Sequence, residues 1–427
     1  MSATLAEPPT STAASSPQGE SPLARLSDEQ LDALGRELDA IHDEVYSELG
    51  ERDSRYIRRT IRFHRQLVIG ARLALLGSRK RSLWLLGTAA LSLAKVLENM
   101  EIGHNVMHGQ WDWMNDPDIN SQTWDWDTAS PADAWRHSHN YEHHTFTNIR
   151  GKDRDLGYEI MRIDPQQKWH PVYLFQPLYN LVLMGFFEWG VALHDLNFEA
   201  IRRGEKSKAQ ALAELKAIGV KARRQVVKDY LAFPALSGLL AAALAGLDTD
   251  KDAPAGPRER GEGKRPGLSA RGKSPASGLR ARGEAARRAY KATLVADFTA
   301  NIVRNVWAHS IIFCGHFPDG VHTFSEDEVA DETRGGWYVR QLLGAANIDG
   351  RPPFHFLSGN LSFQIEHHLF PDMPSSRYAE IAPRVREVCE RYGLPYNTGP
   401  LRKQLGSVHR TILRLAFPGG HKDAPAA

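Results

Sequence analysis

Four long apolar stretches, separated by much more polar sequence, constrain the fold of this chain more than any other feature. They are residues 83–100, 173–193, 229–247 and 293–314. The length of each is close to the roughly 20 residues that a helix needs to cross a bilayer. The mean hydropathy of -0.43 looks soluble only because very polar segments dilute the apolar ones. The pattern predicts an all-α integral membrane protein whose transmembrane helices carry a helical cap, formed by residues 104–170 and 316–410, on one membrane face.

Charged residues inside these stretches must be kept from lipid, because a charge facing hydrocarbon is costly. We therefore expect a protein interior around Lys95, Glu98, Asp297 and Arg304. A further apolar segment, residues 67–77, is short and interrupted by Arg72, so we expect it to lie at the membrane interface. The basic stretch 52–66 before it suits a position beside anionic headgroups.

An amphipathic helix is predicted over residues 27–50, where Ser27 and Gln30 form a capping box and one face is apolar. We expect this helix to dock on its own protein.

Three segments are predicted to be disordered and to delimit a membrane domain over residues 25–410. The N-terminal tail, 1–24, is rich in Ala, Ser, Pro and Thr and lacks the basic start and apolar core of a signal peptide. Residues 248–291 contain twelve basic and six acidic residues, a net +6, and almost no apolar side chains. We expect them to form a loop between two helices. The last segment, 411–427, is expected to be a C-terminal tail.

Composition excludes several classes of protein. The formal net charge of +2 is too balanced to argue for nucleic acid as a partner. Cys314 and Cys389 form no CxxC pair, so no disulfide framework or iron–sulfur site is predicted and a reducing compartment is acceptable. The chain has no CxxCH for attached haem and no Rossmann glycine fingerprint for a built-in reductase.

Histidine is the unusual residue, with 18 copies, several of them in short clusters. The clusters are His104-Asn-Val-Met-His108, His139-Asn-Tyr-Glu-His143-His144, which His137 precedes, and Gln364-Ile-Glu-His367-His368. The i and i+4 spacing of the first cluster places both imidazoles on one helix face. Imidazole is a neutral nitrogen donor that suits iron, copper, zinc and nickel. Seven clustered histidines exceed the needs of a hydrolytic zinc ion, which takes about three protein ligands, and they fit two metal ions.

The spacings HxxxH, HxxxHH and QxxHH resemble the three histidine boxes of the membrane fatty-acid desaturase family. The string Gly359-Asn-Leu-Ser-Phe-Gln-Ile-Glu-His-His-Leu-Phe-Pro371 is similar to the third box of its acyl-CoA and front-end branches. Two further strings, Glu101-Ile-Gly-His-Asn-Val-Met-His-Gly-Gln-Trp-Asp-Trp113 and Phe313-Cys-Gly-His-Phe-Pro-Asp-Gly320, are similar to actinobacterial stearoyl-CoA and linoleoyl-CoA-type enzymes. The likeness covers residues 25–410 except 248–291.

The resemblance implies a histidine-ligated di-iron site in the cap. The ligands that it implies are His104, His108, His139, His143, His144, His316, Gln364, His367 and His368. His309, seven residues before His316, is the alternative to that ligand. The residues expected to steady the ligands are Glu101, His137, Glu142, Asp153, Asp155 and Glu366, because a ligating histidine commonly donates its other N–H to an acid. The residues expected to wall an acyl tunnel, or to belong to an interfacial belt, are Trp111, Trp113, Trp124 and Trp126.

The activity implied by the resemblance is that of a fatty acyl-CoA desaturase, which introduces a cis double bond into a long saturated chain. C18 chains and the Δ9 position are favoured. Two Fe ions and O2 would be needed, together with electrons from a separate NADPH-dependent reductase. A front-end enzyme acting at Δ6 is an alternative, because QIEHHLFP also occurs there. Three more functions stay open at this point: a hydroxylase with the same site, a metal-dependent membrane hydrolase, and a lipid or metal binder without activity.

His316 adds a constraint on topology. All clusters must lie on one membrane face to share a metal pair, but three apolar stretches separate His144 from His316. We expect 173–193 to be the one that does not cross, because it contains Glu188 and precedes a basic segment that would stay inside. The resemblance places the site in the cytosol, at a bacterial plasma membrane, which leaves 248–291 outside.

Overall fold

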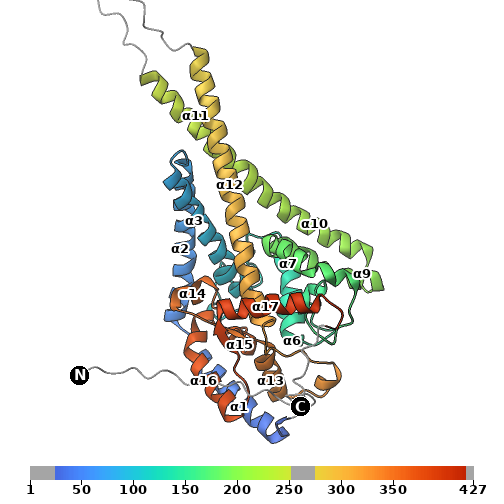
Figure 1. Cartoon of the computed structure of the whole chain (residues 1–427). Coiled ribbons are helices and arrows are strands. Elements are labelled where there is room, and N and C mark those ends of the chain that lie inside the picture. Colours follow the sequence, from blue (N-terminus) through green and yellow to red (C-terminus); the bar gives the residue numbers. More distant parts are fainter. Residues whose placement is uncertain (1–24, 252–274, 420–427) are drawn as a thin grey trace, which may run out of the picture.

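Helices account for almost all of the regular structure. The computed structural model describes residues 25–251 and 275–419, so the predicted tail 1–24 lies outside it. Figure 1 shows these residues as helices joined mostly by short connections. Among them the only strands are β1 (Asn347–Asp349) and β2 (Thr398–Pro400), which pair in parallel. The predicted all-α class is therefore confirmed for the described residues, apart from this two-stranded ribbon.

Two long helical hairpins rise side by side from the rest of the molecule (Figure 1). Their helices are α2 (Glu51–Leu76), α3 (Arg81–Leu97), α11 (Phe233–Lys251) and α12 (Pro275–His316). The Trp84 indole of α3 donates a hydrogen bond of 2.9 Å to the Ala292 carbonyl of α12. The side chains that join the hairpins are Ala71, Leu75, Leu91, Ala296 and Ala300. α2 and α3 are joined at the end far from the cap, and the C-terminal end of α12 reaches the cap.

Residues 67–77, predicted to lie at the membrane interface, do not form a short element of their own. Residues 67–76 are the last part of α2, a helix of 26 residues. Arg72 does not interrupt α2 because its charge is neutralised there. Its guanidinium contacts Asp297 at 2.7 Å and Asp229 at 3.3 Å and lies over the Phe233 ring. The other charged residues of the apolar stretches also face the protein, as predicted: Lys95, Asp297 and Arg304 are buried, and Glu98 accepts a hydrogen bond from the Asp127 backbone.

The apolar stretch 173–193 does not form one helix. It is divided into η6 (Pro171–Phe175), α7 (Gln176–Gly185) and α8 (Phe187–His194), with a break at Phe186 (φ -121°, ψ 35°). This break is compatible with the prediction that the stretch does not cross a membrane. Within the described part of the chain, one helical run is long and apolar enough to cross, Lys208–Leu247. It comprises α10 (Lys208–Gln225), the π-helix η7 (Val226–Ala232) and most of α11.

The prediction that residues 248–291 are disordered is wrong at both ends of that segment. α11 continues to Lys251, and residues 275–291 form the first turns of α12. The sequence there is rich in alanine and arginine, which are strong helix formers. The side chains that pack α12 on α11 are Ala241, Ala285 and Ala289. Where two helices approach closely, alanine side chains are large enough to fill the contact between them. A search for large apolar residues does not detect such a contact. Residues 252–274 lie outside the described residues.

The cap lies at the open end of the hairpins. Its main helices are α1 (Asp28–Ser47), α13 (Arg334–Gly344), α14 (Pro352–Leu357), α15 (Gln364–Leu369), α16 (Tyr378–Arg391) and α17 (Leu401–Leu415). The helix predicted over 27–50 is confirmed as α1, with both hydrogen bonds of the Ser27–Gln30 capping box. Its apolar face, which is Leu31, Leu34, Leu38, Ile41 and Val45, is buried in the core of the cap. α1 therefore docks on its own protein.

The predicted C-terminal tail begins too early. Residues 411–415 complete α17, and Ile412 and Leu415 are buried there. The Ile412 carbonyl accepts a hydrogen bond of 2.6 Å from Gln176 of α7, which ties this end of the chain to the apolar segment. Residues 420–427 lie outside the described part of the chain.

Candidate metal centre

The predicted ligands lie on short helical segments at the open ends of the hairpins. These segments are η2 (Glu98–His104), α4 (Asn105–Met107), α5 (Ala132–Trp135), η4 (Arg136–His143), α6 (His144–Phe146), α15 and the end of α12. η2 and η4 are π-helical, and each ends on a predicted ligand, His104 or His143. A π-helical turn inserts one residue and re-aims the side chains around it, and such turns are frequent at functional sites.

All eight histidines predicted as ligands are buried and gathered into one cluster. In a first group the ring nitrogens of His104, His108, His139 and His367 lie within 4.8 Å of one another. In a second group the same holds for His143, His316 and His368. His144 lies between the groups, with its ring centroid 4.7 Å from that of His108 and 4.5 Å from that of His368. Two adjacent sets of nitrogen donors result.

The nitrogens at the centre of this cluster lack hydrogen-bond partners. This applies to Nε2 of His108, His139 and His143 and to both ring nitrogens of His144. Two further pairs of Nε2 atoms meet each other, His104 with His367 at 3.4 Å and His316 with His368 at 3.3 Å. Buried polar atoms in proteins are nearly always partnered. Converging neutral nitrogens without partners fit bound metal ions of the imidazole-preferring kind.

The outer nitrogens of several of these imidazoles are held by the protein. His143 Nδ1 lies 3.0 Å from Asp153, and His139 Nδ1 lies 3.2 Å from Asp155. In the third cluster, His367 Nδ1 lies 3.2 Å from the Tyr378 hydroxyl, and His368 Nδ1 lies 3.0 Å from Gln341. Contacts of this kind fix the orientation of a ligating ring and leave Nε2 for the metal.

Burial sets the protonation of the cluster. It lowers the pKa of His104, His108 and His367 well below the ordinary range, and repulsion from neighbouring imidazoles adds to this. The neutral imidazole is the form that binds a metal. His143 differs because the Asp153 carboxylate outweighs the effect of burial and raises the pKa of that ring.

The residues predicted to steady the ligands divide into two sets. Asp153 and Asp155 contact ligand histidines, as described above. The four that contact no predicted ligand are Glu101, His137, Glu142 and Glu366. His137 is 69% exposed and faces Glu142, which also pairs with Arg154. Glu101 accepts hydrogen bonds from Tyr56, Asn360 and Ser375, and Glu366 accepts them from Asn347 and Tyr396. A role of these four in steadying the ligands stays a prediction.

Three residues that support the cluster were missed by sequence reasoning. Tyr378 and Gln341 hold ligand rings directly, and His194 lies 3.0 Å from Asp155. Each approaches its partner from another segment of the chain. The sequence carries no local signal for such contacts.

The last apolar helix supplies His316 and not His309 to the cluster. His309 points away, lies 3.0 Å from the Asn180 amide oxygen and stacks on Phe313. Gln364 lies in the second group, with Nε2 3.0 Å from His316 Nε2 and with its amide oxygen buried and unpartnered. The Gln364 amide is therefore the one predicted ligand group besides imidazole that lies beside the second group.

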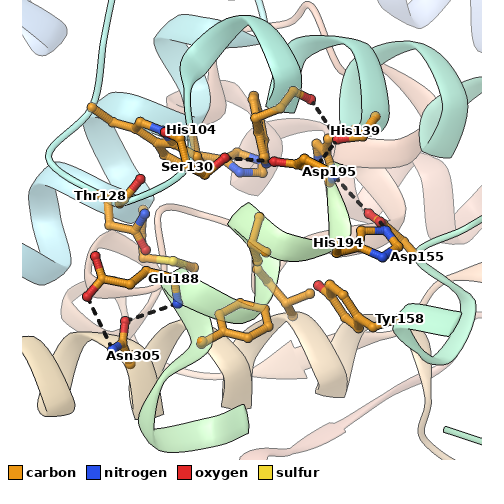
Figure 2. A pocket seen from close by; sticks show the side chains of 18 residues that line it. His104, Thr128, Ser130, His139, Asp155, Tyr158, Glu188, His194, Asp195 and Asn305 are labelled. Atoms are coloured by element: carbon orange, nitrogen blue, oxygen red, sulfur yellow. Dashed lines mark hydrogen bonds and ion pairs between the residues drawn. The ribbon is translucent and has the colours of Figure 1, made fainter. Parts of the chain in front are cut away.

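A cavity lies beside the first histidine group (Figure 2). His104 and His139 of the histidine cluster line one side of it. Its apolar wall is made by Met100, Trp126, Trp135, Tyr158, Phe187, Val191 and Ile312. Its main polar groups bond to protein: Asp195 accepts from Ser130 and Ser138, and Glu188 pairs with Arg304. The cavity therefore places an apolar wall directly beside two of the histidines.

Only one of the four tryptophans predicted to wall a tunnel does so in this cavity, Trp126. Trp111 is buried elsewhere in a core with Ile57 and Ile102, against which Trp113 and Trp124 pack. Those three residues do not line this cavity, and the alternative, an interfacial belt, stays a prediction for them. Trp135, which was not predicted, lines the cavity and stacks on His139 at 4.6 Å.

Fold and site together define a helical protein whose buried histidines converge as the donors of a metal centre. The model of the fatty acid desaturase family matches residues 82–249 and 274–400, and the chain belongs to this family. The resemblance inferred from the histidine boxes is confirmed.

Curated relatives differ in how closely they match. The chain is 45% identical, over 92% of its length and 82% of the relative's, to the NADPH-dependent stearoyl-CoA 9-desaturase of Mycobacterium tuberculosis. It is 24% identical, over 75% of its length and 76% of the relative's, to the sn-1 linoleoyl-lipid 6-desaturase of a Synechocystis species. Human fatty acid desaturase 3 is 36% identical over 20% of the chain and 19% of its own length. No solved structure matches the chain.

Proposed function

We propose that this protein is an acyl-CoA desaturase that introduces a cis double bond at Δ9 of a long saturated chain, with C18 favoured. The observation that carries the proposal is the pair of adjacent histidine groups, the first of which lines a largely apolar cavity. The extensive likeness to a stearoyl-CoA 9-desaturase supports this choice over the Δ6 enzyme, to which identity is much lower.

The proposed metal is a pair of iron ions. The first group of histidines would hold one ion and the second group the other, with His144 and Gln364 as donors at the boundary. Bound iron supplies the reduction of O2 and the removal of hydrogen from an unactivated C–H bond. The protein's part is to hold neutral imidazoles in place through Asp153, Asp155 and Tyr378.

The cavity wall positions the substrate. Trp126 and Trp135 would hold the acyl chain beside His104 and His139, so that one pair of vicinal carbons faces the cluster. Burial excludes bulk water, which would otherwise compete for the reacting species. The choice of carbons then depends on how far the chain extends past these rings.

Electrons must come from another protein. Desaturation converts the saturated acyl-CoA, O2, two electrons and two protons into the unsaturated acyl-CoA and two waters. The chain lacks a nucleotide-binding glycine fingerprint. We therefore propose a separate NADPH-dependent reductase as partner, in line with the NADPH dependence in the mycobacterial relative's name.

The hairpins are proposed to span the bacterial plasma membrane. Large apolar side chains are exposed along them and along α7, namely Phe63, Ile69, Leu73, Leu85, Leu86, Leu178, Leu181, Leu236, Leu239, Leu244, Val295, Phe298 and Val303. An apolar surface of this extent suits lipid. Two hairpins cross an even number of times, so the cap and all the histidines would share the cytosolic face without α7 and α8 crossing.

Lipid analysis of a desaturase-deficient bacterial host that expresses this chain tests the activity. We expect a C18 product two mass units lighter than stearate, with the double bond at Δ9 and dependent on O2. A product heavier by one oxygen would favour the hydroxylase, and a Δ6 product would favour the front-end enzyme. Activity without O2 would support a hydrolase and contradict the proposal.

The orientation has its own test. A cysteine introduced at Ala270 should react with a membrane-impermeant maleimide in sealed cells, because that residue would lie outside. The two native cysteines are buried and supply little background. Protection of the introduced cysteine would reverse the proposed orientation.

A further inference from the structure

The C-terminal end of α8 carries two adjacent buried side chains, His194 and Asp195. They contact Asp155 and Ser138, the neighbours of His139. α8 belongs to the apolar segment that precedes the second hairpin and has no place in any histidine box. Figure 2 shows both side chains at the cavity, with His194 beside Asp155 and Asp195 beside Ser130. Both residues are 8% exposed.

His194 contacts the Asp155 carboxylate, which in turn contacts the ring of His139. His194 Nε2 lies 3.0 Å from one oxygen of Asp155, and the other oxygen of Asp155 lies 3.2 Å from His139 Nδ1. The carboxylate therefore has one partner on each side. Without His194, one oxygen of Asp155 would lose its partner and the carboxylate could turn away from the ring.

Asp195 holds the backbone on which His139 is carried. Its two oxygens accept hydrogen bonds from Ser138 at 2.6 Å and from Ser130 at 2.7 Å. Ser138 immediately precedes His139 within the π-helix η4. A buried carboxylate with two hydroxyl donors fixes η4 relative to the loop that enters it.

The loop that carries Asp155 needs such support. Three consecutive residues after it have positive φ, Gly157 (67°), Tyr158 (53°) and Glu159 (58°). Non-glycine residues in this region are strained and persist only where neighbours hold them. Arg154 donates to the His194 carbonyl and pairs with Glu159, and the Tyr158 ring packs on that of His194 at 5.3 Å. The end of α8 thus supports both flanks of Asp155.

We propose that His194 and Asp195 are positioning residues that orient His139 toward the metal from α8. The inference rests on the proposed di-iron function. His194 acts on the outer side of the ring, through Asp155, and Asp195 acts on the backbone of η4. The segment that does not cross the membrane would thereby contribute to the metal centre without supplying a ligand.

The test compares iron binding among purified full-length proteins. We expect His194→Ala to weaken iron binding 10- to 100-fold, the range typical of partners that orient ligating histidines. His194→Gln should recover much of the loss, because its amide N–H can donate to Asp155. Asp195→Ala should also weaken iron binding, and Asp195→Asn should do so less. Iron per chain after dialysis against graded chelator is the measure, and Mössbauer spectra should change for one of the two irons.

The matched control is His309→Gln, which alters another buried histidine that packs against α7 and not against the cluster. It should keep wild-type iron affinity at a similar melting temperature. Wild-type affinity in His194→Ala and Asp195→Ala would overturn the inference, as would equal losses in His309→Gln. A wild-type protein that binds no iron would instead contradict the proposed function, so the two failures are distinguishable.

Discussion

Two buried polar clusters lie close together in this protein and are built on opposite principles. The ion-pair cluster, between the hairpins, consists of Arg72, Lys95, Asp127, Glu188, Lys228, Asp229, Asp297 and Arg304. Each cation in it contacts a carboxylate, as Lys95 does with Asp229 at 2.8 Å. The histidine cluster, beneath it in the cap, presents inner nitrogens that have no partner or face only another imidazole.

The difference separates a structural role from a binding role. Buried charges are tolerated when each is paired, and the ion-pair cluster satisfies itself with four cations and four carboxylates. The histidine cluster leaves donor atoms unused at its centre while the outer nitrogens of His139, His143, His367 and His368 are held by the protein. Unused, pre-oriented donors indicate a ligand, whereas completed pairs indicate helix packing.

The largest effect is expected from His143→Ala, which removes a donor with an unpartnered Nε2. Iron should fall to well below the wild-type stoichiometry and desaturation should fall below detection, because the second group retains only two imidazoles. Iron analysis and product mass spectrometry measure both. His409→Ala on α17, a half-buried histidine outside the cluster, is the control and should behave as wild type. An active, iron-loaded His143→Ala protein would contradict the assignment of the cluster.

The next effect is on folding and concerns the ion-pair cluster. Asp229→Leu leaves Lys95 and Arg72 short of a partner and should cost about 3–5 kcal/mol of stability. The double variant Lys95→Met/Asp229→Leu should lose less than Asp229→Leu alone, because no charge is then stranded. Thermal unfolding in detergent measures this.

A surface pair gives the control for that experiment. Arg334 and Asp39 are 60% and 44% exposed and lie 3.1 Å apart, so Arg334→Met should cost about 0–1 kcal/mol. Equal losses in the buried and the surface variants would remove the distinction between the clusters.

The sequence predicted those features of the fold and the site whose residues lie close together along the chain. The histidines of one box lie within five residues of each other, and the capping box of α1 is equally local, so both were predictable. His194 and Asp155 are 39 residues apart, and Gln341 and His368 are 27 apart, so only the folded chain reveals those contacts. The helical start of α12 was missed because its alanines pack closely without looking apolar.

A smaller effect concerns the buried carboxyl group of Glu101. Hydrogen-bond donors surround it, but it has no cation as partner, unlike the carboxylates of the ion-pair cluster. Burial raises the pKa of this carboxyl from 4.5 to about 8. Because the folded protein binds this proton more tightly than the unfolded chain does, the group's contribution to the free energy of unfolding is fully present below pH 4.5. That contribution is lost as the pH rises through about 8. Glu101→Gln should remove this loss, so that the variant gains stability over wild type between pH 6 and pH 9. Melting temperatures of both proteins in excess chelator measure the difference, and parallel curves would contradict it.

The smallest effect is expected from His137→Ala, although His137 lies only two residues from His139. Its ring is exposed, faces Glu142 at 3.4 Å and stacks on Tyr141, so it offers no donor to the cluster. Iron content and desaturation should stay within about twofold of wild type, because surface substitutions rarely exceed about 0.5 kcal/mol. His139→Ala, measured beside it, should lose iron and activity. If both variants lost iron, proximity in sequence rather than an unpartnered buried nitrogen would define the site, and the contrast between the two clusters would fail.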